Sequence, residues 1–371
     1  MRSAPFSEPW WRDPCEADSS MMELHEIVGA MHIHSTFSDG TGHYADIIRA
    51  ASDLDLDFLL FSDHGTLEPK RLGREGFHDG VLVGIGYEIN DENNRNHLLA
   101  FELEKEVGRG LSPKEYARRV VESGGWAVIA HPDERRHRLP EFPPYPWTSW
   151  DTEDFHALEI WNQLSEWMEK LSRWNKLWLY INPRRSVVSP TKWTLELWDR
   201  LNLQRRVVGA GGVDAHAHFY PIWSNLGVRI FPYKVHFRSI LSHVLLERPL
   251  DRGDGKSALR QLFEALRGGR LFISNNFLGD ARGFRFWAED VNSGKLFLPG
   301  DRVRAGIDLQ FHVKLPAEHD QVVLIKDSRP IWKRKESAIP HRSSQPGVYR
   351  MEVRRRRRAF IYSNPIVIES S

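Results

Sequence analysis

Cysteine is nearly absent from this chain, because Cys15 is the only one among its 371 residues. An intrachain disulfide is therefore impossible, and a small secreted fold that depends on disulfides is excluded. No stretch approaches the roughly 18 consecutive apolar residues of a membrane-spanning helix. Residues 1–20 also lack the apolar core of a signal peptide. These absences predict a cytoplasmic protein with no membrane partner.

An excess of either charge is missing as well, because 51 Lys and Arg residues stand against 50 Asp and Glu residues, for a formal net charge of +1. The overall charge therefore gives no reason to expect a nucleic-acid partner. A run of arginines at residues 354–358 falls between two expected strands and predicts a solvated hairpin end. A site for a single phosphate group stays open, since it needs only a few local cations.

Short apolar runs alternate with helical patterns over about 250 residues. Runs such as Phe58–Phe61 and Trp126–Ala130 fit parallel strands that are buried on both faces. Tyr44–Leu54 has apolar residues at helical spacing, and Ser112 is a good N-cap for a further helix. This alternation predicts an α/β fold with a parallel sheet or barrel, in which the chemistry lies at the carboxyl ends of the strands.

The pattern changes after one last expected helix, Leu259–Leu266. Alternating apolar runs follow, separated by turn signals such as Pro299-Gly300 and Pro346-Gly347, which is typical of a small antiparallel β-sandwich. We expect this sandwich to pack on the preceding region or to form a homodimer. The expected organisation is an N-terminal tail at residues 1–22, an α/β region at residues 23–274 and a C-terminal β-sandwich at residues 275–371.

Imidazole and carboxylate side chains gather at the ends of the expected strands. His32 and His34 lie two residues apart on the first strand, so that both rings face one side, and Asp39 follows in a Ser-Asp-Gly turn. Five of the seven strand-like runs between residues 24 and 213 end in a side chain of this kind. The candidate metal ligands are His32, His34, Asp39, His64, Glu88, His97, His131, Asp214 and His216.

This set of donors contains no thiolate. A mixture of imidazole and carboxylate suits Zn²⁺, Mn²⁺ or Fe²⁺ and disfavours an iron–sulfur site. Nine ligands exceed the needs of one ion, so we expect two or three divalent metal ions as cofactors. Glu88 is the natural bridge between ions, because a carboxylate has two oxygens.

The motifs that carry these residues resemble those of the PHP family, the metal-dependent hydrolases named for their polymerase and histidinol-phosphatase members. They are H-x-H-S-x-x-S-D-G from His32, S-D-H-G around His64, G-x-E at Glu88, the lone His97, A-H-P at His131 and D-x-H from Asp214. The resemblance covers roughly residues 25–270. It implies a distorted seven-stranded (β/α) barrel with up to three metal ions.

The resemblance also implies how the ligands divide. It groups His32, His34, Glu88 and Asp214 around a first ion, Glu88, His97 and His131 around a second, and Asp39, His64 and His216 around a third. The C-terminal β region, which ends in Ser363-Asn364-Pro365-Ile366, looks like that of the PHP branch that includes carbaryl hydrolase. That branch implies that the substrate need not be a phosphate ester.

Adjacent metal ions lower the pKa of a shared water and so give hydroxide near neutral pH. We therefore predict a metal-dependent phosphoesterase that hydrolyses a small phosphomonoester or phosphodiester through a metal-bridged hydroxide, with Glu88, Asp214 and His216 as catalytic residues. The nearest alternative is a hydrolase of carboxyl or carbamate esters with the same metals. A non-catalytic binding module on the same scaffold is the other alternative.

A phosphorylated substrate needs cations beyond the metal ions. Arginines follow the His131 motif directly, and another arginine pair lies in the loop after Asn182-Pro183. The segment 142–198 carries eight tryptophans, which either pack helices on the barrel or form a lid over an aromatic pocket. The expected substrate contacts are Arg135, Arg136, Arg184, Asn162 and His218.

Overall fold

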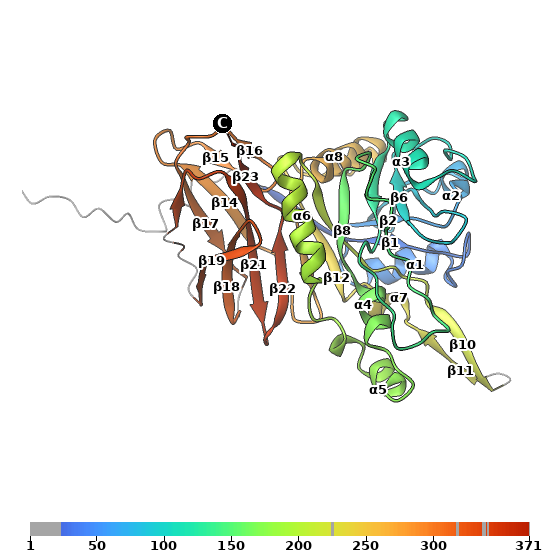
Figure 1. Ribbon diagram of the computed structural model, residues 1–371. Coiled ribbons are helices and arrows are strands. Elements are labelled where there is room, and N and C mark those ends of the chain that lie inside the picture. Colours follow the sequence, from blue (N-terminus) through green and yellow to red (C-terminus); the bar gives the residue numbers. More distant parts are fainter. Residues whose placement is uncertain (1–23, 224–225, 317–318, 336–338, 340, 371) are drawn as a thin grey trace, which may run out of the picture.

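The computed structural model describes residues 24–223, 226–316, 319–335, 339 and 341–370, so the expected tail at residues 1–22 lies outside the described residues. Two regions lie side by side in it (Figure 1). An α/β region holds most of the helices, and the C-terminal strands, in brown and red, form the other region. The predicted α/β fold class is confirmed, because strands and helices alternate through the first region.

The first sheet of the α/β region is built around short, fully buried strands. All four residues of β2 are buried, as expected of a strand with neighbours on both faces. β1, β2 and β4 run parallel, whereas β3 at one edge and β12 and β13 at the other run antiparallel to their neighbours. The order is β3 (Gly76–His78), β4 (Val81–Ile85), β2 (Phe58–Phe61), β1 (His25–Ile33), β12 (Ile240–Leu246) and β13 (Leu271–Asn275).

The second sheet begins with the strand that directly follows β4 in the chain. Residues 81–87 read as one apolar run, but the chain leaves β4 at Gly86 and starts a new strand in the second sheet. A Cβ on Gly86 would lie 2.3 Å from the carbonyl oxygen of Ala100, so only glycine fits this crossing. The order is β5 (Tyr87–Ile89), β6 (Leu98–Phe101), β7 (Trp126–Ile129), β8 (Ala157–Asn162) and β9 (Val208–Gly212).

The two sheets meet at isolated bridges. One bridge joins Ile33 to Ala215 and the other joins His64 to Glu88. The ladder between β1 and β2 is interrupted by a register shift between Met31 and Ile33, at the point where β1 approaches β9. The described strands therefore do not close into one seven-stranded barrel, and the expected barrel is represented by two sheets that converge at one edge.

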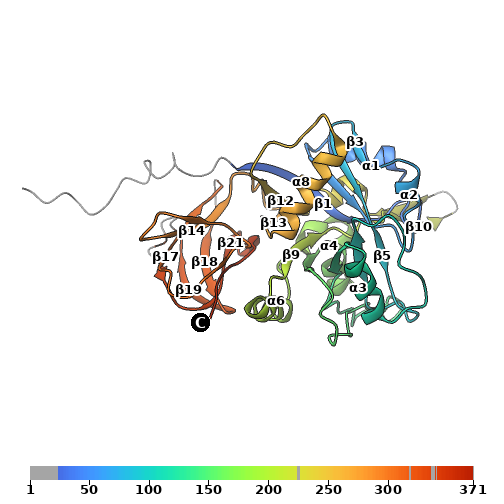
Figure 2. The same cartoon turned by 90° about the horizontal axis from the view of Figure 1, so that it is seen from above.

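The helices α1, α3 and α6 cover the outer faces of the two sheets (Figure 2), whereas α8 packs between the sheets. Ser112 caps α3 as expected, because its Oγ accepts a hydrogen bond of 3.3 Å from the Glu115 N–H. Residues 163–181 form two helices, α4 and α5, which are separated at residues 171–175. The helices of this region are α1 (Tyr44–Ser52), α2 (Glu68–Arg71), α3 (Pro113–Glu122), α4 (Gln163–Lys170), α5 (Lys176–Ile181), α6 (Lys192–Gln204), α7 (Tyr233–His236) and α8 (Gly255–Arg267).

A hairpin that the sequence analysis did not predict extends from the α/β region. It consists of β10 (His218–Trp223) and β11 (Leu226–Ile230), which pair in antiparallel register. Figure 1 shows the hairpin projecting from the end of the molecule that also carries α4 and α5. The hairpin begins directly after the D-x-H motif, so it leaves the edge at which the candidate ligands lie.

The C-terminal strands form a four-stranded antiparallel sheet and an extension of the first sheet. β22 pairs with β13, so the ladder runs without a break from the α/β region into the C-terminal strands. Between the two C-terminal sheets lies one apolar core that includes Phe286, Phe311, Leu324 and Met351. The separate sandwich is thus not confirmed, and the domain boundary at residue 275 stays a prediction.

The remaining strands complete these sheets, and the expected arginine-rich hairpin end is found at the turn between β21 and β22. The four-stranded sheet contains β14 (Arg285–Asp290), β15 (Leu296–Phe297), β17 (Leu309–Lys314) and β20 (Arg342–Ser343). The extension contains β16 (Arg302–Val303), β18 (Gln321–Lys326), β19 (Arg329–Arg334), β21 (Gly347–Arg355), β22 (Arg358–Ser363) and β23 (Ile366–Ile368).

A buried ion cluster ties the helix α6 to the strand β21. The Nε of Arg350 lies 2.7 Å from Asp199 Oδ1, and its Nη1 lies 2.5 Å from Glu352 Oε1. The side chains of Arg350 and Asp199 are each 2% exposed. Every charge in this cluster has an opposite charge within hydrogen-bond distance, which is the condition for burying it.

Among the described residues, no helix is both long enough and apolar enough to span a membrane.

Candidate metal centre

The nine candidate ligands lie at the edge where the two sheets converge. His32, Asp214 and His131 come at or just after the carboxyl ends of β1, β9 and β7. His97 precedes β6, but β6 runs antiparallel to β7, so the amino end of β6 lies at the same edge. The expectation that strand ends collect these side chains therefore holds for the antiparallel strand as well.

Glu88 lies at the centre of the candidate site and is 1% exposed. Its Oε2 lies 3.1 Å from His32 Nε2 and 3.2 Å from His34 Nε2. His64 Nδ1 lies 3.5 Å from the same Oε2. Its other oxygen, Oε1, lies 2.6 Å from His97 Nδ1 and 3.6 Å from His131 Nε2. The two oxygens thus face different sets of imidazoles, which is the arrangement that a carboxylate shared by two metal ions requires.

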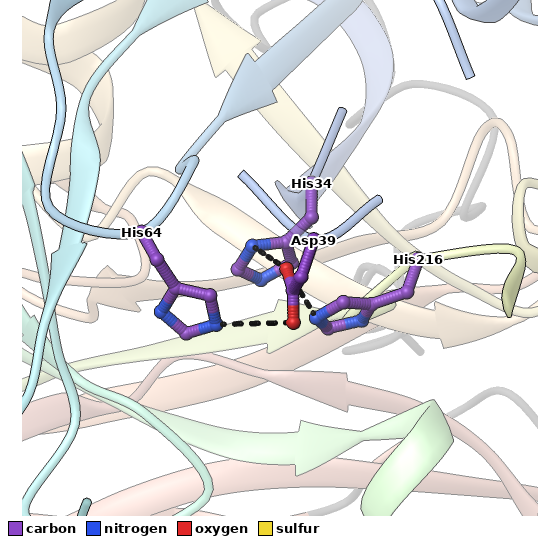
Figure 3. Close-up of side chains that lie close together, drawn as sticks. All are labelled: His34, Asp39, His64 and His216. Carbon is purple, nitrogen blue, oxygen red and sulfur yellow. Dashed lines mark ion pairs between the residues drawn. The ribbon is translucent and has the colours of Figure 1, made fainter. Parts of the chain in front are cut away.

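A second part of the site is formed by His34, Asp39, His64 and His216 (Figure 3). The carboxylate of Asp39 lies 3.7 Å from His34 Nδ1, 3.8 Å from His64 Nε2 and 3.3 Å from His216 Nε2. The rings of His34 and His216 stack with centroids 3.9 Å apart. Four possible ligand atoms from separate elements therefore point into one small space.

The donors form three groups in which the ligand atoms all lie within 4.8 Å of one another. All three differ from the groups that the family resemblance implies. His34 joins the group of Asp39, His32 takes the place of His97 beside Glu88 and His131, and Glu88 is absent from the group of His32, His34 and Asp214. The groups are His34, Asp39, His64 and His216; His32, Glu88 and His131; and His32, His34 and Asp214. The assignment of ligands to particular ions stays a prediction.

Charges in the site shift the pKa values of its members in opposite directions. Burial alone would raise the pKa of Glu88, but the imidazoles of His32, His97 and His64 hold it well below its usual range. Burial alone would lower the pKa of His34, but Asp214 and Glu88 raise it to about 9. The pKa of His131 is also raised to about 9, mainly by Glu88 against the effect of burial. Ionised carboxylates therefore hold protons on neighbouring imidazoles in the absence of another cation.

The pKa of His64 is shifted in the opposite direction from the pKa values of His34 and His131, because the carboxylates near His64 do not outweigh the effect of its burial. Burial lowers its pKa to about 4. Its ring is therefore neutral at pH 7, which is the form that binds a metal ion.

The backbone is left-handed at three of the candidate ligands. The φ angles are +66° at His32, +27° at His131 and +52° at Asp214. Residues other than glycine seldom adopt this conformation, and those that do cluster at functional sites. At each of these positions the strand has just ended or is about to end, and the side chain lies beside other candidate ligands.

Glu159 is a buried carboxylate of the site that the sequence analysis did not select. Its Oε1 lies 2.9 Å from His32 Nδ1, and its Oε2 accepts a hydrogen bond of 2.8 Å from the His131 N–H. A Cβ on Gly212 would lie 1.5 Å from Glu159 Oε1, so glycine is required for this carboxylate to fit. The signal in the sequence was an acidic residue inside an otherwise apolar strand, Ala157–Asn162.

Asp63 organises the loop that follows His34. Its carboxylate accepts hydrogen bonds from the N–H and the Oγ of Ser35, at 2.7 and 2.8 Å, and from Ser38 Oγ at 2.7 Å. These bonds fold the loop back, so that Asp39 reaches the side of the sheet on which His34 lies. The serines of the H-x-H-S-x-x-S-D-G motif therefore have a structural role.

A cavity of about 770 Å³ opens onto the candidate ligands, and we call it the central cavity. One side of it consists of ligand candidates, including Asp39, Glu88 and Asp214. The opposite side, which we call the apolar wall, consists of Leu139, Phe142, Leu164, Trp167, Met168 and Leu171. The cavity therefore has one polar and charged end and one apolar end.

Two of the five expected substrate contacts, Arg136 and His218, line the central cavity. The other three do not. Arg135 pairs with Asp133 at 2.9 Å outside it, because their side chains lie two residues apart on one exposed loop. Arg184 lines a different pocket, and its carbonyl oxygen accepts a hydrogen bond from Arg358. Asn162 caps α4 and donates to Glu159 at 2.8 Å, so it supports the site without lining the central cavity.

Trp167 is the one among the eight described tryptophans of residues 142–198 that lines the central cavity. Trp161 and Trp198 are buried in the main core, as the packing interpretation expects. Trp174 and Trp178 are exposed on α5 and the turn before it. The tryptophans as a group therefore do not form the lid that the alternative interpretation predicted.

The donors fit divalent metal ions. His34 is fully buried, and neither of its ring nitrogens has a hydrogen-bond partner; the same holds for Nδ1 of His131. Unpaired buried nitrogens are costly unless a further partner binds them. Six imidazoles and three carboxylates around those atoms are donors that Zn²⁺, Mn²⁺ or Fe²⁺ accepts.

Comparisons with known proteins give structural neighbours that are PHP-like metal-dependent phosphoesterases and an amidohydrolase. A two-domain protein from Bacteroides vulgatus that contains a predicted PHP-like metal-dependent phosphoesterase is 15% identical, with 92% of this chain and 95% of that chain covered and a TM-score of 0.44. An amidohydrolase from Chromobacterium violaceum, with bound sulfate and no metal, is 14% identical over 51% of this chain and 87% of that chain, with a TM-score of 0.30.

One curated relative is an uncharacterized protein of Methanocaldococcus jannaschii, which is 28% identical over 117 residues. The match covers 28% of this chain and 66% of that relative's length. No family model matches the chain. Similarity of this size leaves the activity to be argued from the residues of the site.

Proposed function

We propose that the protein is a metal-dependent hydrolase and that it hydrolyses a small phosphomonoester or phosphodiester. The observation that supports this most directly is the position of Glu88, whose two oxygens face separate sets of imidazoles at the end of a cavity. Divalent ions bound there neutralise developing charge and acidify a water molecule.

The residues with roles in the reaction are proposed from their places around the cavity. Glu88 and Asp214 supply negative charge that holds cations, and His216 fixes the position of Asp39. Glu159 keeps the His32 ring in one orientation, since a carboxylate that accepts from the second nitrogen of a ligand histidine fixes its tautomer. Asn162 contributes only through Glu159.

Arg136 is the proposed contact for the anionic group of the substrate. It lines the central cavity, and its buried Nε has no hydrogen-bond partner. Its Nη2 lies 2.5 Å from Glu134 Oε1, so the guanidinium is held in place. A fixed guanidinium with a free N–H binds a phosphoryl oxygen with defined geometry.

His218 is proposed to contact the leaving group. It lines the cavity, and its ring stacks on His216 with centroids 4.8 Å apart. Burial lowers its pKa, so the ring is neutral near pH 7 and can donate or accept a hydrogen bond.

The second candidate is a hydrolase of carboxyl or carbamate esters at the same site. The apolar wall supports this candidate, because an uncharged ester needs little beyond apolar contacts and the metal ions. A non-catalytic binding module has less support, since all nine donors are retained around one edge and open into a cavity.

The deciding experiment measures the metal content of the purified protein together with its hydrolysis of nitrophenyl phosphate, bis(nitrophenyl) phosphate and nitrophenyl acetate. Bound Zn, Mn or Fe with cleavage of either phosphate ester is the expected result. Metal with cleavage of the acetate alone would replace the phosphoesterase with the second candidate. Failure to bind any divalent metal would remove the proposal altogether.

A further inference from the structure

The central cavity is larger than a small phosphate ester needs. Its volume of about 770 Å³ lies in the upper part of the range of roughly 300–1,000 Å³ that holds drug-sized ligands. The candidate ligands occupy one end of it. Most of the remaining surface must therefore contact a part of the substrate that is distant from the bond that is cleaved.

The apolar wall belongs to a separate apolar cluster of the molecule. Leu139, Trp167 and Leu171 pack there with Phe231, apart from the main core of the sheets. The segments that build it are the loop after β7, α4 with the turn that follows, α5, and the end of β11 with the residue after it. These segments leave the edge of the sheets at which the metal centre lies, so the cluster extends the cavity away from that centre.

Two cations line the same cavity, Arg173 from the turn before α5 and Lys176 from the first position of α5. Arg173 and Lys176 are both exposed, and neither has an ion-pair or hydrogen-bond partner among the described residues. Arg136 differs from them, because it is paired with Glu134 and packs over Tyr145, whose ring stacks on His97. Arg136 therefore belongs to the metal end of the cavity, and Arg173 and Lys176 follow Leu171, a residue of the apolar wall, in the chain.

We infer that the substrate is an elongated amphipathic ester that carries a bulky apolar body and a second acidic group. The scissile group lies at the metal end beside Arg136, and the apolar body covers Trp167, Met168 and Leu171. The second acidic group is bound by Arg173 and Lys176. This inference rests on the proposed function, since it names the substrate class of the same site.

The charge of the cavity lining agrees with this assignment. Outside the metal end, Arg173 and Lys176 are the lining cations and Glu141 is the lining carboxylate among the described residues. A cleft with an excess of one charge attracts ligands of the opposite charge. An uncharged apolar substrate would leave Arg173 and Lys176 without a partner in the complex.

The test measures binding of three phosphonates, which are not hydrolysed, to the full chain loaded with Mn²⁺. The probes are methylphosphonate, 4-biphenylylphosphonate and the same biphenyl compound with a 4′-carboxyl group, and titration calorimetry gives each Kd. We expect the biphenyl compound to bind at least about tenfold more tightly than methylphosphonate, since two aromatic rings are removed from water. The carboxyl group is expected to add about a further threefold, because exposed ion pairs are weak.

Variants test the contact with the carboxyl group and the contact with the apolar body separately. Arg173→Gln combined with Lys176→Gln should remove the gain from the carboxyl group and leave the biphenyl gain intact. Met168→Gln, a change at a partly exposed residue of the apolar wall, should weaken both biphenyl compounds. Arg138→Gln and Trp174→Gln are the matched controls, since both side chains are exposed and neither lines the cavity.

Each outcome decides a different claim. Equal binding of all three phosphonates would overturn the inference and leave the proposed function in place. A carboxyl gain that persists in the double variant would overturn the role of Arg173 and Lys176. Binding of no phosphonate, with or without Mn²⁺, would count against the proposed function itself and would remove the inference with it.

Discussion

Two buried clusters of charge in this protein are built in opposite ways. In the cluster of Arg350, Asp199 and Glu352, each charge meets an opposite charge within hydrogen-bond distance. In the metal centre, carboxylates are surrounded by imidazoles, and the ring nitrogens of His34 have no hydrogen-bond partner. The first cluster is complete without a ligand, and the second is incomplete. Burial of charge therefore indicates a binding site only where donors are left unpaired.

The largest expected effect comes from removing a donor at the incomplete cluster. His32→Ala and Asp214→Asn should each lower turnover by about three orders of magnitude, because charge stabilisation in the cavity depends on the bound cations. The fold should persist, since the strands pack through their apolar residues. Hydrolysis rates and metal content measured on the same preparation test this, and full activity in both variants after metal removal would contradict the metal hypothesis.

A substitution in the complete cluster should lower the stability of the protein and not its activity. Arg350→Met should cost about 3–5 kcal/mol of unfolding free energy, because Asp199 and Glu352 are left buried without a cation. Urea unfolding gives this number, and the metal content of the folded fraction serves as the control. A stable variant that had lost its metal would show that the two clusters are not independent.

A smaller effect is expected at the residue that joins the metal centre to the strand β8. Glu159→Gln should weaken metal affinity about 10–100-fold, because the His32 ring loses the carboxylate that fixes its orientation. Competition with a chelator measures the change. The matched variant Gly212→Ala should have a similar effect without altering any polar group, since its Cβ would displace the Glu159 carboxylate.

The smallest effect concerns pH. His34 and His131 have pKa values raised to about 9 in the metal-free protein, so both rings carry protons at pH 7. A metal ion must displace these protons, so its affinity should rise with pH up to about 9 and fall as the pH drops. Calorimetry in buffers of different ionisation enthalpy counts the protons released, and no release at pH 7 would contradict the prediction.

The sequence was sufficient to predict which residues come together at the edge of the sheets. Parallel strands with apolar interiors end at one edge, so residues such as His64, His131 and Asp214 could be grouped from their positions alone. The short strands themselves were also predictable, because β2 and β7 are apolar throughout. Both predictions depend only on the order of residues within short stretches of the chain.

Other features depend on contacts that no local pattern contains. The division of the run 81–87 between two sheets depends on the approach of Gly86 to Ala100. The position of Glu159 depends on the space left by Gly212. Of the arginines near the site, Arg136 could not be told apart from Arg135 in the sequence, since Arg135 turns outward to pair with Asp133.

The C-terminal strands give a further example. Their alternation predicted a separate sandwich, but alternation does not show which partner an edge strand takes. β22 pairs with β13 in the α/β region, and the Asn364 side chain hydrogen-bonds to both backbone polar groups of Gly209. Such long-range pairing is decided by the whole fold.

The left-handed backbone at His32, His131 and Asp214 has a consequence for selection. An L residue in this conformation costs roughly 1–2 kcal/mol, and glycine adopts it freely. Screening random variants for heat resistance alone, under metal-free conditions, should therefore enrich glycine at these three positions. Screening for turnover should exclude it there. The two selections would then favour different residues at the same three positions. This difference separates the residues that stabilise the fold from those that the site requires.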